Sequence, residues 1–168
     1  MSKGSPAKLK KVAVSLPFGL GSAEWETDST QRNAAWALYV ELVTRIAVQE
    51  LADDAGLVRE AMNSLYTLFG TTRQILREAG PDVGATHDSV GGLAIAVLNK
   101  GLRPFLSHWH PVLQIWEAQR PIDRSPKEHE VLWAGEKVAR QELSALRGEL
   151  EIYAHALAEV AGVSGVKS

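Results

Sequence analysis

The residues best suited to chemistry lie in one short stretch, Gly101 to Pro111, in which Arg103 is followed by His108 and His110. An imidazole can transfer a proton, and a guanidinium can bind a phosphate and stabilise developing negative charge. Seven helical steps of about 100° return to within about 20° of the starting direction, whereas five steps end about 140° away. On a helix, Arg103 therefore shares a face with His110 and not with His108.

This stretch resembles the motif of HEPN-family ribonucleases, all-helical proteins in which an Arg is followed by a His after four to six residues. The resemblance implies metal-independent cleavage of RNA. His110 would move a proton to or from a ribose hydroxyl or its leaving group, Arg103 would hold the phosphate, and two copies of the motif would face one another across a dimer. The family's polar residue after the Arg is Pro104 here. The alternative interpretation is an ordinary solvated stripe of polar residues, formed by Asn99, Arg103, His110, Gln114 and Glu117.

The rest of the composition excludes several other classes of chemistry. The chain of 168 residues has no cysteine, which excludes disulfides, thiolate zinc sites, cysteine nucleophiles and iron–sulfur clusters. It has no Glu-x-x-His pair, no Gly-x-Gly-x-x-Gly turn, no Walker-type phosphate loop and no Gly-x-Ser-x-Gly motif. We therefore expect no metal and no cofactor.

Charge and hydropathy limit the partners. Eighteen basic and twenty acidic residues give a net charge of -2, so nucleic acid is expected as a partner only if the ribonuclease interpretation holds. The apolar runs, such as Leu93 to Leu98, are far shorter than the roughly 20 residues that cross a bilayer. No signal-peptide pattern follows the lysines near the N-terminus. These features predict a cytoplasmic protein without a membrane segment.

The hydrophobic periodicity predicts an all-α fold, an antiparallel four-helix bundle with an extended N-terminal arm. The expected helices cover residues 29–52, 58–79, 89–119 and about 35 residues from a capping box at Ser125. The expected domain organisation is a flexible or extended arm over residues 1–28, the bundle over 29–162 and a disordered tail over 163–168. Gly91 and Gly92 are expected to allow two backbone segments to approach closely.

The arm and the last helix carry the predicted binding residues. Val12, Val14 and Leu16 alternate with smaller residues as in a β-strand, and a lone strand cannot form a sheet. We expect the arm to lie across the helices with Phe18, Leu20 and Trp25 as anchors, or else to add to the sheet of another protein. Trp133 lies off the main apolar stripe of the last helix and is the candidate for an exposed interface aromatic. An overhanging end of that helix would bind another protein or a second copy of the chain.

A broader resemblance covers most of the chain. Residues 15–26, from Ser15 to Glu26, residues 98–105, and Trp109-His110-Pro111 are similar to uncharacterised helical proteins from high-GC bacteria, which resemble modules found beside bacterial immune or conflict systems. This resemblance implies a non-enzymatic interaction or assembly module, with an accessory or signalling role in a defence-type system.

Overall fold

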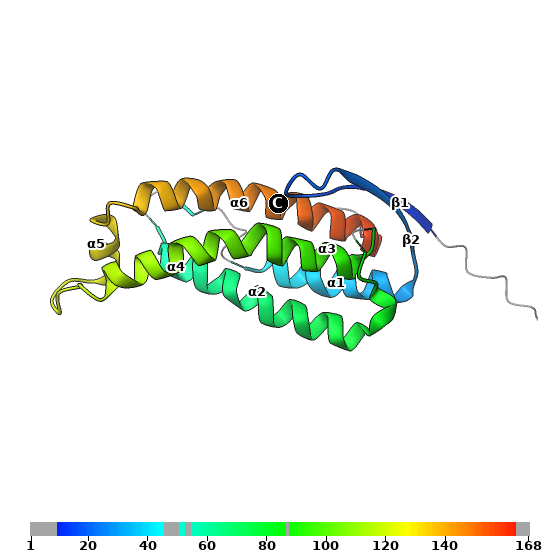
Figure 1. The fold of residues 1–168 in the computed structure, drawn as a ribbon, viewed down its shortest axis with the longest axis horizontal. Helices are drawn as coiled ribbons and strands as arrows, with labels where there is room; N and C mark the ends of the chain where they lie inside the picture. The colour runs from blue at the N-terminus through cyan, green and yellow to red at the C-terminus, as the bar shows by residue number, and fades with distance from the viewer. Residues whose placement is uncertain (1–9, 46–50, 53–54, 87, 164–168) are drawn as a thin grey trace, which may run out of the picture.

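The computed structural model describes residues 10–45, 51–52, 55–86 and 88–163. The protein is predominantly helical, with one small two-stranded antiparallel sheet at the N-terminal end of the described chain. The long helices run along the longest axis of the molecule, and the sheet lies over one end of them (Figure 1). Among the described residues, no helix combines the length and hydrophobicity that a bilayer crossing requires.

The N-terminal arm is a β-hairpin, which corrects the expectation of a lone extended strand. β1 (Lys10–Ser15) pairs with β2 (Ser22–Thr27), and Val12 lies opposite Trp25. One face of the β1–β2 hairpin is buried in the core, where Val12, Val14 and Trp25 are only 5–7% exposed. The hairpin packs against α6 (Glu136–Ala161) and joins the same hydrophobic core as the helices. The predicted division into an arm and a separate helical body therefore does not describe residues 10–28.

The turn of the hairpin is fixed by contacts with two helical segments. The backbone N–H of Phe18 donates to Glu149 Oε2 of α6 over 2.6 Å, and Phe18 has a positive φ of 55°. Its ring lies over Gly101, where an added Cβ would come within 2.3 Å of Phe18 Cζ. Gly101 is part of η3 (Val97–Leu102), a π-helical segment. Because Gly101 has no side chain, the Phe18 ring can pack directly against its backbone.

Replacing Gly101 with alanine should lower the free energy of unfolding, because it disturbs the packing of Phe18. The new methyl group must displace the Phe18 ring, and overpacking of this kind costs about 1–3 kcal/mol of unfolding free energy. The matched control is Gly148→Ala in α6, where an added Cβ meets nothing within 4 Å and helix propensity predicts a gain of up to about 1 kcal/mol. Urea unfolding of both variants measures the difference. Equal stabilities of the two variants would contradict the assigned role of Gly101.

The first two predicted helices are present, and the first of them is shorter than predicted. α1 (Ser29–Val43) is capped by Asp28, whose side chain accepts from the Gln31 N–H over 2.9 Å, and it ends short of Ala52. Residues 46–50 of the predicted helix lie outside the described residues. α2 (Val58–Ala79) has the predicted bounds. The 3₁₀ turn η2 (Pro81–Val83) follows it.

The third predicted helix is a continuous helical rod. It consists of α3 (Val90–Ala96), η3 and α4 (Arg103–Glu117), and Ser89 caps its first turn through Gly92 N. An added Cβ at Gly92 would lie 1.8 Å from Thr86 O, and one at Gly91 would lie 2.0 Å from Gly84 O. The close backbone approach predicted for these two glycines is thus confirmed.

The fourth predicted helix is two helices, α5 (Pro126–Val131) and α6, separated by a turn. In this turn the Trp133 ring is buried at 7% exposure and packs edge to face on Trp109, with the ring centroids 5.5 Å apart. An added Cβ at Gly135 would lie 2.6 Å from Trp133 Cζ2, so the ring lies directly over this glycine. The expectation of an exposed Trp133 is wrong, because the break in the helix lets its ring reach the core.

The helices pack in neighbouring pairs. α1 contacts α6 and α2, α2 contacts α4, and α4 contacts α6. Leucine is the commonest residue type buried among them, and Leu42, Leu65, Leu113 and Leu150 are each no more than 2% exposed. At the C-terminal end Val163 also packs against the core, and the rest of the predicted tail, residues 164–168, lies outside the described residues.

Candidate functional site

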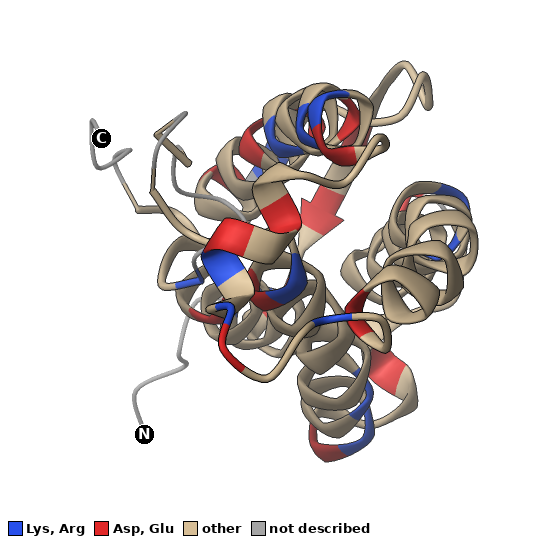
Figure 2. Ribbon diagram, turned by 90° about the vertical axis from the view of Figure 1, so that its left-hand side faces the viewer, with Lys and Arg blue, Asp and Glu red and all other residues tan. Residues whose placement is uncertain are grey.

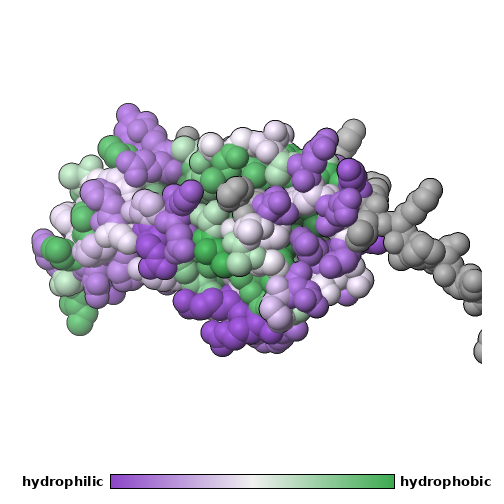
Figure 3. All heavy atoms as spheres, turned by 45° about the vertical axis from the view of Figure 1, so that its right-hand side comes forward, coloured by the Kyte–Doolittle hydropathy of each residue, from purple (hydrophilic) through white to green (hydrophobic). Residues whose placement is uncertain are grey.

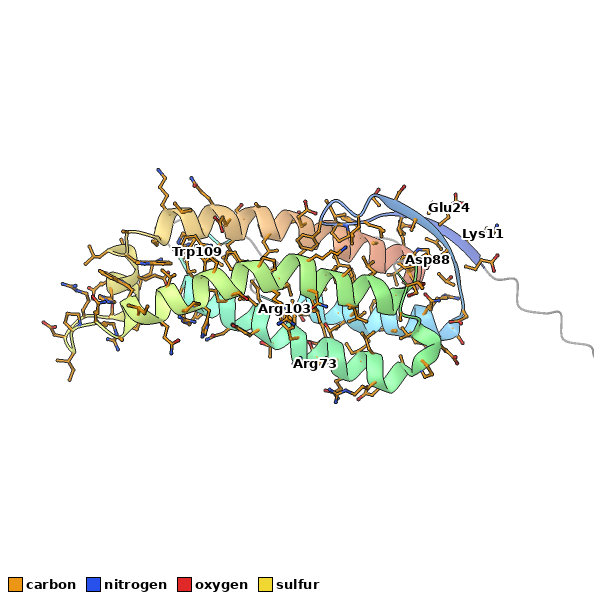
Figure 4. All side chains as sticks on the ribbon, in the orientation of Figure 1. Lys11, Glu24, Arg73, Asp88, Arg103 and Trp109 are labelled. Carbon is orange, nitrogen blue, oxygen red and sulfur yellow. The ribbon has the colours of Figure 1, made fainter. Side chains whose placement is uncertain are left out.

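Arg103 and His110 share one side of α4, as their spacing predicts. In the structure this side faces α2. The Arg103 guanidinium carbon lies 5.2 Å from the centroid of the Phe69 ring, and the His110 ring meets Tyr66 edge to face at 5.1 Å. Figure 4 labels Arg103 where α4 lies beside α2. The two residues are seven apart on one helix, about 10 Å along its axis. Arg103 itself donates to Asn99 Oδ1 from Nε and Nη2 over 3.3 and 3.2 Å.

The guanidinium in direct contact with His110 belongs to Arg59 of α2. Arg59 Nη1 lies 2.8 Å from His110 Nδ1. Because a guanidinium can only donate, Nδ1 accepts this hydrogen bond and the ring proton lies on Nε2. The other side of Arg59 is held by Glu117, which accepts from Nε and Nη2 over 2.9 and 2.8 Å. Glu117, Arg59 and His110 thus form a chain of charge-assisted hydrogen bonds between α2 and α4, which we call the Arg59 cluster.

This geometry limits what His110 can do. A general base needs a free nitrogen lone pair, and in His110 that lone pair is occupied by Arg59. The imidazole in this state is a hydrogen-bond donor through Nε2. His110 can accept a proton only after Arg59 has moved away.

A second polar cluster lies at the end of the molecule that carries α5. Glu130 is 4% exposed, and its carboxylate accepts from Val58 N over 2.8 Å and from Arg59 N over 3.4 Å. It therefore caps the N-terminus of α2, for which the N-cap residue Leu57 has no side-chain acceptor. Arg140 Nη2 lies 3.6 Å from Glu130 Oε1, and Arg140 also contacts Glu136 and the Gly56 carbonyl. One buried carboxylate thus ties α5, α2 and α6 together.

His129 joins α5 to α4. Its ring stacks on Trp116 with the centroids 4.5 Å apart, and its Nε2 donates to the Trp116 carbonyl over 2.8 Å. The Trp116 indole N–H donates in return to the His129 carbonyl over 2.9 Å. His129 is 3% exposed and its Nδ1 has no partner among the described residues. This buried imidazole acts as a structural connector between the two helices.

The capping box predicted at Ser125 is present. Ser125 Oγ accepts from Glu128 N over 3.3 Å, and the Glu128 carboxylate accepts from Ser125 N over 2.9 Å. The Ser125 N–H, and after it the Ser125 hydroxyl, which donates to the same carboxylate over 2.8 Å, lower the pKa of Glu128 below its ordinary value. The box fixes the start of α5 and the end of the loop before it.

The four predicted binding residues are not gathered on one surface. Trp25 and Trp133 are buried, and Phe18 and Leu20 are half-buried in the hairpin turn. Their contacts join the hairpin and the α5–α6 turn to the rest of the protein. None of the four presents a fully exposed side chain to a partner.

Exposed aliphatic side chains lie instead at the end that carries α5. They are Ile115 at 66% exposure, Ile122 at 102%, Val131 at 57% and Leu132 at 58%. We call these four residues the α5-end surface. Hydrophobic side chains are visible at this end in Figure 3, on the left. Beside them an open groove of about 570 Å³ is lined by Val131 and Leu132 together with Asp123, Arg124, Lys127 and Glu128.

Within the described ranges, no group of three or more His, Asp or Glu side chains is placed to hold a metal ion. Comparison with protein-family models, with curated proteins and with solved structures finds no match to this chain.

Proposed function

We propose that this chain is a non-enzymatic protein-interaction or assembly module, an antiparallel bundle of four helices that binds a partner protein through the α5-end surface. The observation that carries the proposal is the exposure of four large aliphatic side chains, each more than half accessible, at one end of the molecule. Clustered exposed hydrophobic side chains are typical of protein-interaction sites. A shallow, open depression that Val131 and Leu132 share with four charged residues lies at the same end.

The proposed binding surface differs from the hairpin and from the end of α6, where the sequence predicts binding. The apolar side of the hairpin is buried against the helices, and the last turns of α6 bury Tyr153, Leu157 and Val160. Covered surface of this kind is not free to bind a partner. The segment from the end of α4 through α5 carries the four most exposed of the large aliphatic side chains in the described part of the chain.

The proposed setting is the cytoplasm of a bacterium, where the module would serve as an accessory or signalling component of a defence-type system. The support for this setting is the sequence resemblance to helical proteins of conflict systems. The partner would present an apolar side chain or ridge to the α5 end.

Affinity capture with matched variants tests the interaction. The double variant Ile122→Ser/Leu132→Ser removes two exposed aliphatic side chains and should fold normally, because neither contributes to the core. The control is Ile95→Ser on α3, an exposed isoleucine outside the α5-end surface. A partner retained by the wild type and by the control but lost by at least tenfold in the double variant would support the proposal. A partner that all three proteins retain equally would place binding elsewhere.

A second candidate function is a metal-independent ribonuclease that uses Arg103 and His110. The observation in its favour is that both side chains lie along the junction of α2 and α4, with the exposed Tyr66 beside His110. Arg59, which contacts His110 directly, would be the nearer phosphate ligand. RNA binding would have to draw Arg59 away from His110 Nδ1 before His110 could take a proton.

Incubation with RNA in the presence of a chelator decides between the two functions. If His110 is catalytic, His110→Ala should abolish cleavage while the melting temperature stays within a few degrees of the wild type. The control His155→Ala changes an exposed histidine of α6 and should leave cleavage unchanged. Absence of cleavage by the wild-type protein, or cleavage that survives in His110→Ala, would remove this candidate.

A further inference from the structure

A small cavity lies inside the bundle, between α1, α2, η3 and α6. Figure 2 looks along the bundle and shows the long helices grouped around a common centre. Most of the cavity wall is aliphatic, and it includes Leu42 of α1, Leu68 of α2, Leu102 of η3 and Leu150 of α6. The cavity volume is about 10 Å³, which is close to the room that one water molecule needs.

The cavity lies where the third helical rod changes its geometry. Val97, Leu98 and Leu102 of the π-helical segment η3 line it. In a π-helix each hydrogen bond spans one residue more than in an α-helix, so the turn is wider than the α turns on either side of it. The regular packing of the rod against α1, α2 and α6 is therefore interrupted at this point, and a small space remains.

Two residues with hydroxyl groups border the cavity. Tyr153 of α6 is 5% exposed, and its hydroxyl has no hydrogen-bond partner in the described part of the chain. Burial raises the pKa of Tyr153 above its ordinary value, so the phenol remains protonated and can donate. Thr72 of α2 is 6% exposed, and a threonine hydroxyl can both donate and accept. Glu41 also lines the cavity, but its carboxylate pairs with Arg45.

We propose that this cavity is a binding site for one water molecule, which joins Tyr153 of α6 to Thr72 of α2. A buried hydroxyl without a partner destabilises the folded state, and buried waters satisfy such groups. The water accepts a hydrogen bond from Tyr153 Oη and donates one to Thr72 Oγ1. The volume leaves no room for a larger ligand. This site is separate from the α5-end surface, so its test does not bear on the proposed function.

A high-resolution crystal structure of the full chain tests the inference directly. It should show one density peak in the cavity, about 2.7–2.8 Å from Tyr153 Oη and within hydrogen-bond distance of Thr72 Oγ1. A cavity without density, or a Tyr153 hydroxyl that donates to a protein group, would overturn the inference.

Urea unfolding of Tyr153→Phe gives an independent answer, because the two alternatives predict different signs. Loss of a water-mediated hydrogen bond should raise the equilibrium constant for unfolding roughly two- to tenfold. Removal of a buried hydroxyl that has no partner should instead leave this constant unchanged or lower it, and that result would contradict the bound water. The matched control is Tyr66→Phe on α2, where the tyrosine is 44% exposed and the wild-type stability should be retained.

The double variant Tyr153→Phe/Thr72→Val tests whether both residues bind the same water. If they share one water, the second substitution should raise the unfolding constant by a smaller factor than it does alone in the wild type. Effects of the two substitutions that simply multiply would show that Thr72 is not the second ligand, and the proposed link between α2 and α6 would be wrong.

Discussion

Glu130→Ala should lower the free energy of unfolding by about 1–3 kcal/mol, the usual cost of leaving a buried hydrogen-bond donor without its acceptor. The Glu130 carboxylate is buried, and it accepts hydrogen bonds from the first turn of α2 while it lies beside Arg140. Alanine leaves the Val58 N–H without its acceptor and removes one of the two carboxylates beside Arg140, which keeps only Glu136. Both losses weaken the attachment of α5 to α2 and α6.

Chemical denaturation of matched variants measures this effect. Glu130→Gln keeps one oxygen that can accept from Val58 N but loses the charge and the second acceptor, so its stability should lie between those of the wild type and Glu130→Ala. The control is Glu159→Ala, an exposed carboxylate in the last turn of α6, which should change stability by less than about 0.5 kcal/mol. A Glu130→Ala protein as stable as the control would show that the cluster does not hold α5 to α2 and α6.

Trp25→Ala should destabilise the protein by about 3–5 kcal/mol, as expected for truncation of a buried aromatic side chain. Trp25 is 5% exposed on the inner face of β2 and packs with the hydrophobic core. The chain offers a control of the same residue type, because Trp36 on α1 is 49% exposed. Thermal unfolding of both variants should show a loss for Trp25→Ala several times that for Trp36→Ala.

This comparison decides whether the hairpin is part of the folded core or a removable arm. If the hairpin is removable, both tryptophan variants should unfold at nearly the same temperature as the wild type. The burial of Val12, Val14 and Trp25 predicts the opposite result, and it also predicts that a chain lacking residues 1–28 will not unfold cooperatively.

The elements that sequence predicts best are those specified by local signals. α2 has the predicted bounds because a regular spacing of apolar residues runs between a helix start at Val58 and a stop at Gly80-Pro81. The capping box at Ser125 and the close approach at Gly92 are equally local, since each depends on residues within a few positions. These features require no knowledge of the tertiary fold.

The errors arise where distant segments determine the outcome. β2 has a period-2 pattern, with Ala23, Trp25 and Thr27 on one face, but a short strand is stable only with its partner β1. The spacing of apolar residues continues from α5 into α6, so periodicity does not reveal the break at which Trp133 turns into the core.

In the candidate site, too, sequence predicts the contacts within one helix but not those between helices. The spacing of Arg103 and His110 correctly indicates a common side of α4, because both residues belong to one helix. The direct partner of His110 is Arg59, 51 positions earlier on another helix, and no spacing rule connects the two. Glu130 follows the polar residues Lys127, Glu128 and His129, so no local signal marks it as buried, and its partners at Val58 and Arg140 depend on the fold.

Site-specific photo-crosslinking in living cells tests the central claim, that the α5-end surface is where this chain binds a protein. A photoreactive residue at position 122 replaces a fully exposed side chain, and one at position 95 on α3 provides the control at another exposed isoleucine. The account predicts a crosslinked protein at position 122 that is absent at position 95, identified by mass spectrometry as another protein or a second copy of the chain. No crosslink at position 122, or the same products at both positions, would contradict it.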